Sequence, residues 1–282
     1  MRFYTRQHVH YCGIDLHARS LYVCILDQEG KTLVHRKLTC DREQLLKTLA
    51  PYREDLAVAV ECLFCWYWVA DLCAEHGILL VIDAVICGFG RLGTWFGIER
   101  YGVAPDLVTF AKGVTSGYLP LGGVLVSPEV AAPWWTTPGE RTLRHGPTYS
   151  GHPTCCAAGL ATLDVYDREN LIPRGQELEG VLEAALAPLR EHPYVAEVRA
   201  GTGLLAAVEL TPDVLSSVRD APNALLRGAR EAGVLVRGLG KGVAVSPPLT
   251  ITEEEIRLLG EGIRAGLDLL PVEPPVPSAP GA

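Results

Sequence analysis

The sequence predicts an α/β fold in which short buried strands alternate with helices. Two apolar runs indicate such strands: Leu79 to Asp83, and Asp106 to Ala111, which leads into Lys112. Both are rich in Val, Leu and Ile and are bounded by Gly or Pro, which is typical of buried parallel strands. Ligands of open α/β sheets bind at the ends of such strands. An acid and a lysine are thus placed where one small molecule could contact both.

Composition narrows the class of protein. The chain has 282 residues, of which 48% are hydrophobic, so it can bury a sizeable core in two or three domains. Its net charge of −8 argues against a nucleic-acid or membrane-surface binder. No apolar run is long enough to span a bilayer, and the polar start RFYTRQHVH is not a signal peptide. We therefore expect a cytoplasmic protein with no membrane partner.

The nine cysteines are scattered, mostly in apolar segments. This distribution is typical of reduced thiols in a cytosolic protein rather than of a disulfide framework. Cys62 and Cys65 form a C-x-x-C pair, but no second pair follows at the spacing of a zinc site. We expect both to be core residues of a helix, and no metal site.

The first 78 residues predict the order strand, strand, strand, helix, strand, helix. The helices are expected after Asp41, which can act as an N-cap, and in an aromatic run that closes at Gly77. The expected strands are Tyr11–Leu16, Leu21–Leu26, Thr32–Leu38 and Leu56–Val60.

This order, with Asp15 in the first strand and Glu61 after the fourth, resembles a truncated RNase H-like segment. YCGIDLHARSLYVCILDQEGK and LAVAVECLFCWYWVADLCAEHGI resemble the start of DEDD-type (RuvC-like) insertion-sequence transposases, over about residues 10–78. The resemblance implies that Asp15 and Glu61 match two of the acids that hold Mg²⁺ for DNA cleavage. It ends near Gly77, before two further aspartates, so we favour acids that no longer bind metal. A remnant nuclease and a non-functional gene fusion remain as alternatives.

Three further motifs follow in fixed order: VIDAVICGFGRLGTWFG, PDLVTFAKGVTSGYLPLGGVLVS and HGPTYSGHPTCCAAGLA. They closely resemble the class III aminotransferases, fold type I enzymes that use pyridoxal 5′-phosphate (PLP), over about residues 79–270. The resemblance implies part of a fold type I large domain and a C-terminal α+β small domain. It also implies a homodimer that moves an amino group from a small-molecule amine or amino acid to a 2-oxo acid.

The resemblance gives four residues a role. Lys112 matches the lysine that forms a Schiff base (aldimine) with PLP and carries a proton. Asp83 matches the acid that pairs with the pyridine nitrogen. Thr148 matches a threonine that reaches the cofactor phosphate of the neighbouring subunit. Arg237 matches an arginine that holds a substrate carboxylate in the amine-transaminase branch.

Three departures from the family pattern matter. Ala84 replaces an acid that usually follows the pyridine-binding Asp. Ala244 replaces an arginine of members that use α-amino acids and 2-oxoglutarate, so substrates with a second carboxylate are disfavoured. Residues 1–78 match none of the family's phosphate loop or the ring that stacks on the pyridine, so we expect weak or no turnover.

Gly88, Gly90 and Gly93 also spell G-x-G-x-x-G after a strand, the dinucleotide fingerprint. A dinucleotide-binding turn opens directly into a helix, whereas TWFG, with poor helix character, follows these glycines. We therefore reject a dinucleotide site.

The sequence predicts four segments: 1–78 (RNase H-like), 79–194 (large-domain portion with the lysine), 195–271 (small domain) and 272–282 (disordered, Pro-rich). Thr252 and Glu255 form a capping box that predicts a final helix to about Leu270. Other expected elements are helices at Thr154–Asn170, Gly175–Glu191 and Ala221–Ala232, a hairpin over 195–210, and short strands in VLVRGL and VAVSPPL.

Overall fold

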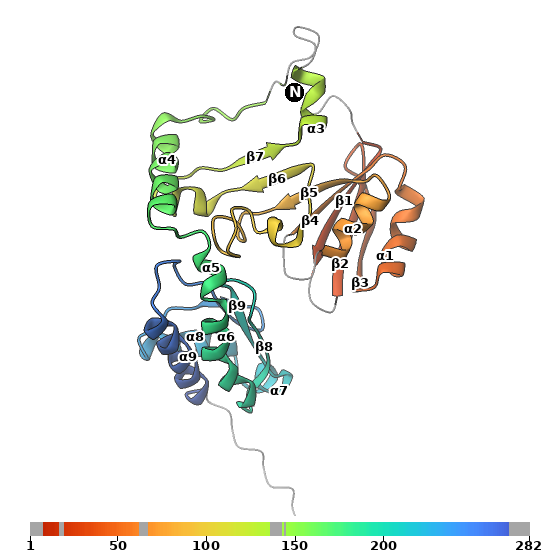
Figure 1. The fold of residues 1–282 in the computed structure, drawn as a ribbon. Coiled ribbons are helices and arrows are strands. Elements are labelled where there is room, and N and C mark those ends of the chain that lie inside the picture. The colour runs from red at the N-terminus through yellow and green to blue at the C-terminus, as the bar shows by residue number, and fades with distance from the viewer. Residues whose placement is uncertain (1–7, 17–19, 62–66, 136–142, 144, 271–282) are drawn as a thin grey trace, which may run out of the picture. The chain divides into compact units, whose positions relative to one another are not determined.

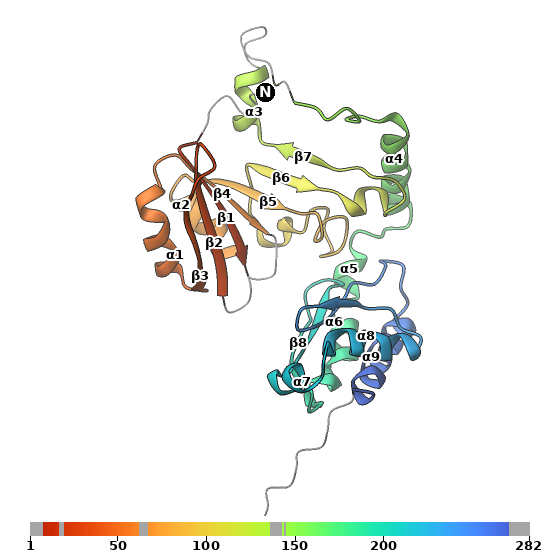
Figure 2. The same cartoon turned by 180° about the vertical axis from the view of Figure 1, so that it is seen from behind.

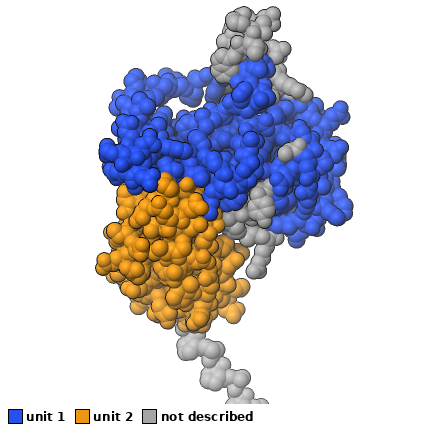
Figure 3. Space-filling model, in the orientation of Figure 1, with its two compact units in different colours: residues 1–90, 94–172 blue, residues 91–93, 173–282 orange. Residues whose placement is uncertain are grey.

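A computed structural model of the chain describes residues 8–16, 20–61, 67–135, 143 and 145–270. These residues form two compact units: unit 1, residues 1–90 with 94–172, and unit 2, residues 91–93 with 173–282 (Figure 3). The four segments predicted from sequence remain a prediction. Cys62, Cys65 and the tail 272–282 lie outside the described residues.

Unit 1 is built on a seven-stranded sheet with the order β3-β2-β1-β4-β5-β6-β7 (Figure 1). β1, β4, β5 and β6 are parallel, whereas β2, β3 and β7 are antiparallel to their neighbours. β4 and β5 pair directly, so the residues before and after position 78 contribute strands to one sheet. The strands are β1 (His10–Leu16), β2 (Ser20–Asp27), β3 (Thr32–Thr39), β4 (Leu56–Glu61), β5 (Leu79–Asp83), β6 (Leu107–Phe110) and β7 (Gly123–Val126).

Helices α1 (Arg42–Leu49) and α2 (Tyr67–Glu75) lie on one face of this sheet (Figures 1 and 2). Strand residues that point toward them are buried, and their neighbours along each strand are more exposed, as the two-residue period requires. The predicted N-cap is confirmed, since Asp41 accepts a hydrogen bond from the Gln44 backbone. The expected order of three strands, helix, strand and helix is also confirmed.

The rest of unit 1 surrounds the ends of β5 and β6. It contains the 3₁₀ turns η2 (Ile98–Tyr101) and η3 (Lys112–Thr115) and the helix α4 (Pro153–Arg168), which packs on η3. The sequence predicted α4 but neither β7 nor α3 (Pro128–Trp135). Both follow a run of Gly and Pro that carries no hydrophobic periodicity.

Unit 2 is an antiparallel four-stranded sheet with the order β10-β11-β9-β8 and several helices. Its strands are β8 (Val195–Arg199), β9 (Ala206–Leu210), β10 (Arg237–Leu239) and β11 (Gly242–Val245). Its helices are α5 (Arg174–Glu177), α6 (Glu179–Leu186), α7 (Pro212–Ser217), α8 (Ala221–Glu231) and α9 (Glu253–Asp268), with the 3₁₀ turn η4 (Ala187–Glu191).

The capping box of α9 is confirmed, because Thr252 and Glu255 exchange hydrogen bonds with each other's backbone. The helical segment expected over about 175–191 is present, but as three consecutive pieces, α5, α6 and η4, rather than one helix. The backbone departs from α-helical angles at Leu178 (φ −93°, ψ −4°). The 3₁₀ turn η4 begins at Ala187, directly before Pro188, which has no backbone N–H to continue the α-helical hydrogen bonds. Within the described ranges, no helix is both long enough and apolar enough to cross a bilayer.

Candidate active site

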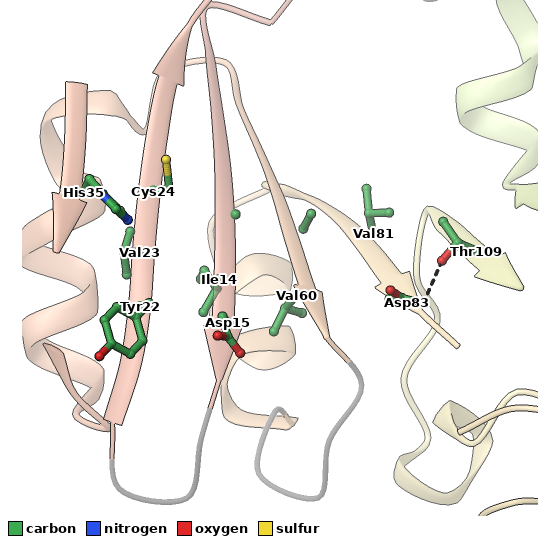
Figure 4. Close-up of a pocket in the computed structure, with 12 residues that line it drawn as sticks. Ile14, Asp15, Tyr22, Val23, Cys24, His35, Val60, Val81, Asp83 and Thr109 are labelled. Atoms are coloured by element: carbon green, nitrogen blue, oxygen red, sulfur yellow. Dashed lines mark hydrogen bonds between the residues drawn. The ribbon is translucent and has the colours of Figure 1, made fainter. Parts of the chain in front are cut away.

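Asp83 is the last residue of β5, and its carboxylate has a fixed orientation. Oδ1 accepts hydrogen bonds from the Val85 backbone at 2.9 Å and from the Thr109 hydroxyl at 3.1 Å (Figure 4). Oδ2 has no partner among the residues that the structure describes. The side chain is exposed, so Oδ2 is available to a ligand.

The register of β5 and β6 creates this contact. Asp106, just before β6, accepts a hydrogen bond from the Leu80 backbone through its carboxylate at 2.8 Å and donates its own N–H to Leu80 O at 3.0 Å. This two-point contact aligns the strands, so that Thr109 lies directly opposite Asp83. Sequence reasoning missed Thr109, because no local signal reports which residues face each other across parallel strands.

Lys112 follows Thr109 by three residues, on the order of 10 Å of extended chain. Its backbone φ is +46°, in the left-handed region that non-glycine residues adopt only at a cost on the order of 1 kcal/mol or more. The side chain is exposed and has no hydrogen-bond or ion-pair partner in the described part of the chain. Such strain marks a candidate functional position rather than an ordinary surface lysine.

An aromatic cluster holds the backbone next to Lys112. Tyr166 of α4 donates its hydroxyl hydrogen bond to Gly113 O at 2.8 Å. A Cβ added at Gly113 would lie 2.6 Å from Phe89 Cβ, so only glycine fits beside that ring. Phe89 also stacks on Tyr166, with ring centroids 6.2 Å apart. Sequence reasoning missed this support. The position of Tyr166 within the predicted helix could have indicated that its ring is buried.

The sheet face opposite α1 and α2, here called the open face, contains a groove of about 910 Å³ (Figure 4). Asp83 and Thr109 line one end of this groove, and Asp15 and Tyr22 lie along it. Lys112 is not among its lining residues. The structure therefore places Asp83 and Thr109 together and Lys112 beyond them on the same strand path.

The other two predicted residues are not among those that line the groove. Thr148 is exposed, in a turn that precedes α4 within unit 1. Arg237 belongs to unit 2, where it is exposed on β10 and lies directly opposite Ala244 of β11. Because Ala244 is small, the Arg237 side chain has an uncrowded neighbour on its own sheet face.

Of the two acids in the alternative metal reading, Asp15 lies on the same face. Asp15 is exposed and lines the groove, and the backbone of Glu61 pairs with that of Asp83 in neighbouring strands. The Glu61 side chain lies outside the described atoms. Among the side chains described, no three His, Cys, Asp or Glu residues come together as metal ligands.

Two cysteines lie beneath the sheet, on its covered face. Burial raises the pKa of Cys12 and of Cys73 to about 12, with a smaller contribution from neighbouring cysteines for Cys12 and from Asp106 for Cys73. Both thiols therefore stay protonated at neutral pH, when a nucleophile or metal ligand would need the thiolate. They are core residues and not part of the site.

Comparison with known proteins gives this arrangement a family. The family model for aminotransferase class III matches residues 66–267, which is most of the chain. The fold agrees, because a solved (S)-enantioselective ω-transaminase from Thermomicrobium roseum superposes with a TM-score of 0.73 at 39% identity, over 80% of this chain and 54% of that one. The chain belongs to the class III aminotransferases, and its α/β fold resembles that of fold type I enzymes.

Individual relatives are much longer than this chain. Gamma aminobutyrate transaminase 3 of Solanum lycopersicum is 41% identical over 67% of this chain but only 37% of its own length. The omega-aminotransferase of Caulobacter vibrioides is 40% identical over 68% of this chain and 44% of its own length. A PLP-bound amine transaminase from an uncultivated Pseudomonas species gives a TM-score of 0.73 at 36% identity, over 80% of this chain and 55% of that one. The chain thus spans less than half the length of these curated relatives.

Proposed function

We propose that the chain is a PLP-dependent aminotransferase of the amine or ω-amino acid type, with its cofactor site at the ends of β5 and β6. The observation that carries the proposal is a pair of groups without partners among the described residues: Asp83 Oδ2 at the end of β5, and the Lys112 ammonium at the start of η3, just after β6. An acid and an amine fit the two ends of PLP, its pyridine nitrogen and its aldehyde. The residues present therefore suit the cofactor at those two points.

PLP, when bound, supplies a ring that accepts the electrons left when a substrate carbon loses its proton. Asp83 would keep a proton on the ring nitrogen, and Thr109 would hold the carboxylate in place for that task. Lys112 would bind the cofactor aldehyde and then move a proton at the substrate carbon. Tyr166 and Phe89 would fix the direction of Lys112 by holding Gly113.

The remaining predicted roles extend this proposal to a homodimer in the cytoplasm. Thr148 would contact the phosphate of a cofactor bound to a second copy, and its exposed position leaves it accessible for that contact. Arg237 would hold the carboxylate of a 2-oxo acid, and Ala244 opposite it leaves room for the guanidinium to move. Turnover is expected to be weak, because residues 1–78 match no phosphate-binding loop.

Reductive labelling tests cofactor binding directly. Purified protein is mixed with PLP, reduced with borohydride and mapped by peptide mass spectrometry, with Lys112→Ala and Lys47→Ala as a matched pair. Lys47 is an exposed lysine of α1, so it reports non-specific labelling. We expect the label on Lys112, lost in Lys112→Ala and kept in Lys47→Ala. Equal labelling of many lysines, or no labelling at all, would contradict specific PLP binding at Lys112.

We further propose that residues 10–78 descend from a DEDD-type transposase and adopt an RNase H-like segment. The run β1-β2-β3-α1-β4-α2 and the position of Asp15 on the open face support this ancestry. The proposal concerns origin rather than DNA cleavage. Sequencing the flanking genomic DNA tests it: transposase coding sequence should adjoin this gene in related strains, and its consistent absence would argue against the fusion.

A further inference from the structure

Unit 1 has a second pocket, at the outer strand β3 rather than at β5 and β6. It encloses about 370 Å³, and its lining comes from β3, from the last turn of α1 and from the 3₁₀ turn η1 (Ala50–Tyr52). β3 and α1 lie side by side at one end of the sheet (Figures 1 and 2). Small-molecule sites typically measure about 300–1,000 Å³, so this volume suits a small ligand.

The pocket is positively charged within an acidic chain. The chain has 33 acids and 25 lysines and arginines, yet the described residues that line the pocket include Arg36 and Lys47 and no acid. Arg36 forms no ion pair in the described part of the chain. Lys47 lies 3.6 Å from Glu43, one helical turn away, in a highly exposed pair of the kind that contributes little to stability. Both cations are therefore available to an anion.

A buried hydroxyl orients the Arg36 guanidinium. Thr48 is only 3% exposed, and its Oγ1 accepts a hydrogen bond from Arg36 Nη2 at 2.6 Å. The same hydroxyl donates its proton to Gln44 O at 2.8 Å, within α1. The guanidinium keeps further N–H donors, and a planar fork of donors in a fixed orientation is suited to a phosphate or a carboxylate.

The end of α1 opposes an anion, but only weakly. Lys47 and Thr48 lie in its last turn, where the helix dipole amounts to about half a negative charge. The full positive charges of Arg36 and Lys47 outweigh it. Cations at a helix C-terminus also stabilise the helix, so a purely structural role for Arg36 has to be tested separately.

The rest of the lining is largely apolar or aromatic. Val34 and Pro51 contribute apolar surface, and Tyr52 contributes a ring that packs edge to face with His10, at a centroid distance of 5.1 Å. The Tyr52 hydroxyl has no hydrogen-bond partner among the residues that the structure describes. One side of the pocket thus suits an anion, and the other suits a flat organic group.

We propose that this pocket binds a small phosphomonoester. Its phosphate would lie on Arg36 and Lys47, and its organic part would lie against Val34, Pro51 and Tyr52. A phosphomonoester carries close to two negative charges and three acceptor oxygens, which matches two cations and a guanidinium fork better than a carboxylate does. The site uses none of the residues assigned to PLP, so its test is independent of the cofactor proposal.

Titration of the full chain with phenyl phosphate, followed by the width of the phosphorus NMR resonance, measures the affinity. Phenyl phosphate has a phosphomonoester and a ring but no aldehyde, so it cannot form a Schiff base with a lysine. We expect saturable binding that weakens with added salt. Inorganic phosphate, which lacks the ring, should bind at least about threefold more weakly. No saturable binding of phenyl phosphate, or equal affinity for inorganic phosphate, would overturn the assigned ligand.

Two neighbouring cations of β3 form a matched pair of variants. Arg36→Gln removes the charge and the fork, so it should weaken phenyl phosphate binding at least about tenfold. Lys37 is not among the lining residues, and its ammonium lies 5.5 Å from the ring centroid of Tyr22, which lines the groove of the open face. Lys37→Gln should therefore leave the affinity within about twofold of the wild type. Equal losses in the two variants would show a general effect of net charge and would overturn the site.

Stability measurements separate binding from a structural role. If Arg36 only stabilised the end of α1, Arg36→Gln would lower the free energy of unfolding and leave the affinity for phenyl phosphate unchanged, which would overturn the proposal. Thr48→Val keeps the charge of Arg36 but removes the hydroxyl that orients it. We expect this variant to bind phenyl phosphate about threefold to tenfold more weakly, with the charge-dependent effect of salt retained.

Discussion

The two units both leave one sheet face uncovered by described residues, but these faces carry different side chains. In unit 2 the uncovered face bears an ionic cluster: Arg199 contacts Glu197 at 2.7 Å and Glu209 at 2.9 Å, and Lys241 lies 3.6 Å from Glu209. The open face of unit 1 instead carries mostly small or apolar side chains, among them Tyr22, Ala59 and Val81.

Strand direction explains why this difference matters. Antiparallel sheets commonly have one solvated, polar face, as in unit 2, whereas parallel strands are ordinarily covered on both faces. Four strands of unit 1 are parallel, and the chain spans less than half the length of its curated relatives. The solvated face of unit 2 is therefore ordinary for an antiparallel sheet, whereas the parallel strands of unit 1 lack, among the described residues, the cover that such strands ordinarily have on both faces.

Substitutions at two neighbouring residues of β5, one on each face of the sheet, test this comparison. They have the largest expected effect on the free energy of unfolding. Leu80 is 4% exposed on the covered face, so Leu80→Ala should lower the free energy of unfolding of unit 1 by about 3 kcal/mol, through lost burial and a cavity. Val81 faces the groove on the open face, so Val81→Ala should cost less than about 1 kcal/mol.

Tryptophan fluorescence during denaturation measures this difference in unit 1 alone, because all five tryptophans belong to that unit. Equal losses in the two variants would mean that the open face is covered in solution. The tryptophans are residues 66, 68, 95, 134 and 135.

Glycine positions test the packing of unit 2. Gly228 of α8 meets Gly266 of α9 so closely that an added Cβ would lie 2.8 Å from its Cα. Gly228→Ala should therefore destabilise unit 2 by about 1–2 kcal/mol, even though Ala is the better helix former. Gly180 is an exposed position of α6 with open space around it, so Gly180→Ala should stabilise unit 2 by up to about 1 kcal/mol.

Circular dichroism follows both glycine variants, and the tryptophan signal of unit 1 serves as the internal control. The same substitution is thus expected to have opposite signs at two helix positions. Stabilisation of equal size at both would show that helix propensity, not the approach of α8 to α9, decides the effect in unit 2.

Local signals in the sequence predicted much of this fold. Asp41 and the Thr252–Glu255 pair identified helix starts, because caps depend on residues three positions apart. Short apolar runs bounded by turn residues located strands of both sheets, whereas β7 was missed, since its four residues follow Pro and Gly without any period. The break at Leu178 was also missed, because nothing in its immediate sequence forbids a helix.

The candidate site was predicted less completely than the fold. Asp83 and Lys112 were identified from their motifs, and their assignment to PLP remains a proposal. The hydroxyl of Thr109 and the ring of Tyr166 act through register and packing between distant segments. The spacing of residues along the chain does not predict either contact, Thr109 with Asp83 or Tyr166 with Gly113. The left-handed backbone of Lys112 likewise depends on Gly113, Phe89 and α4 being in place together.

The ionic cluster of unit 2 has the smallest expected effect on stability, and that effect should depend on pH. The pKa of Glu209 is lowered: partial burial opposes this, but the hydrogen bonds and charges of Arg199 and Lys241 outweigh it. As pH falls from neutral, the unfolded chain therefore takes up this proton before the folded one. The stabilisation is present above the ordinary carboxyl pKa and is lost as pH falls through the lowered value in the folded state.

Glu209→Gln should accordingly destabilise unit 2 by less than about 1 kcal/mol at neutral pH, since the pair is partly solvated. The two proteins should converge in stability as the pH becomes acidic, when the wild type has lost the charge. Glu231→Gln, an exposed acid of α8 outside the cluster, should show no such convergence. A constant gap between wild type and Glu209→Gln at every pH would mean that the side chain stabilises the sheet by packing, and that the solvated face of unit 2 is not electrostatic in origin.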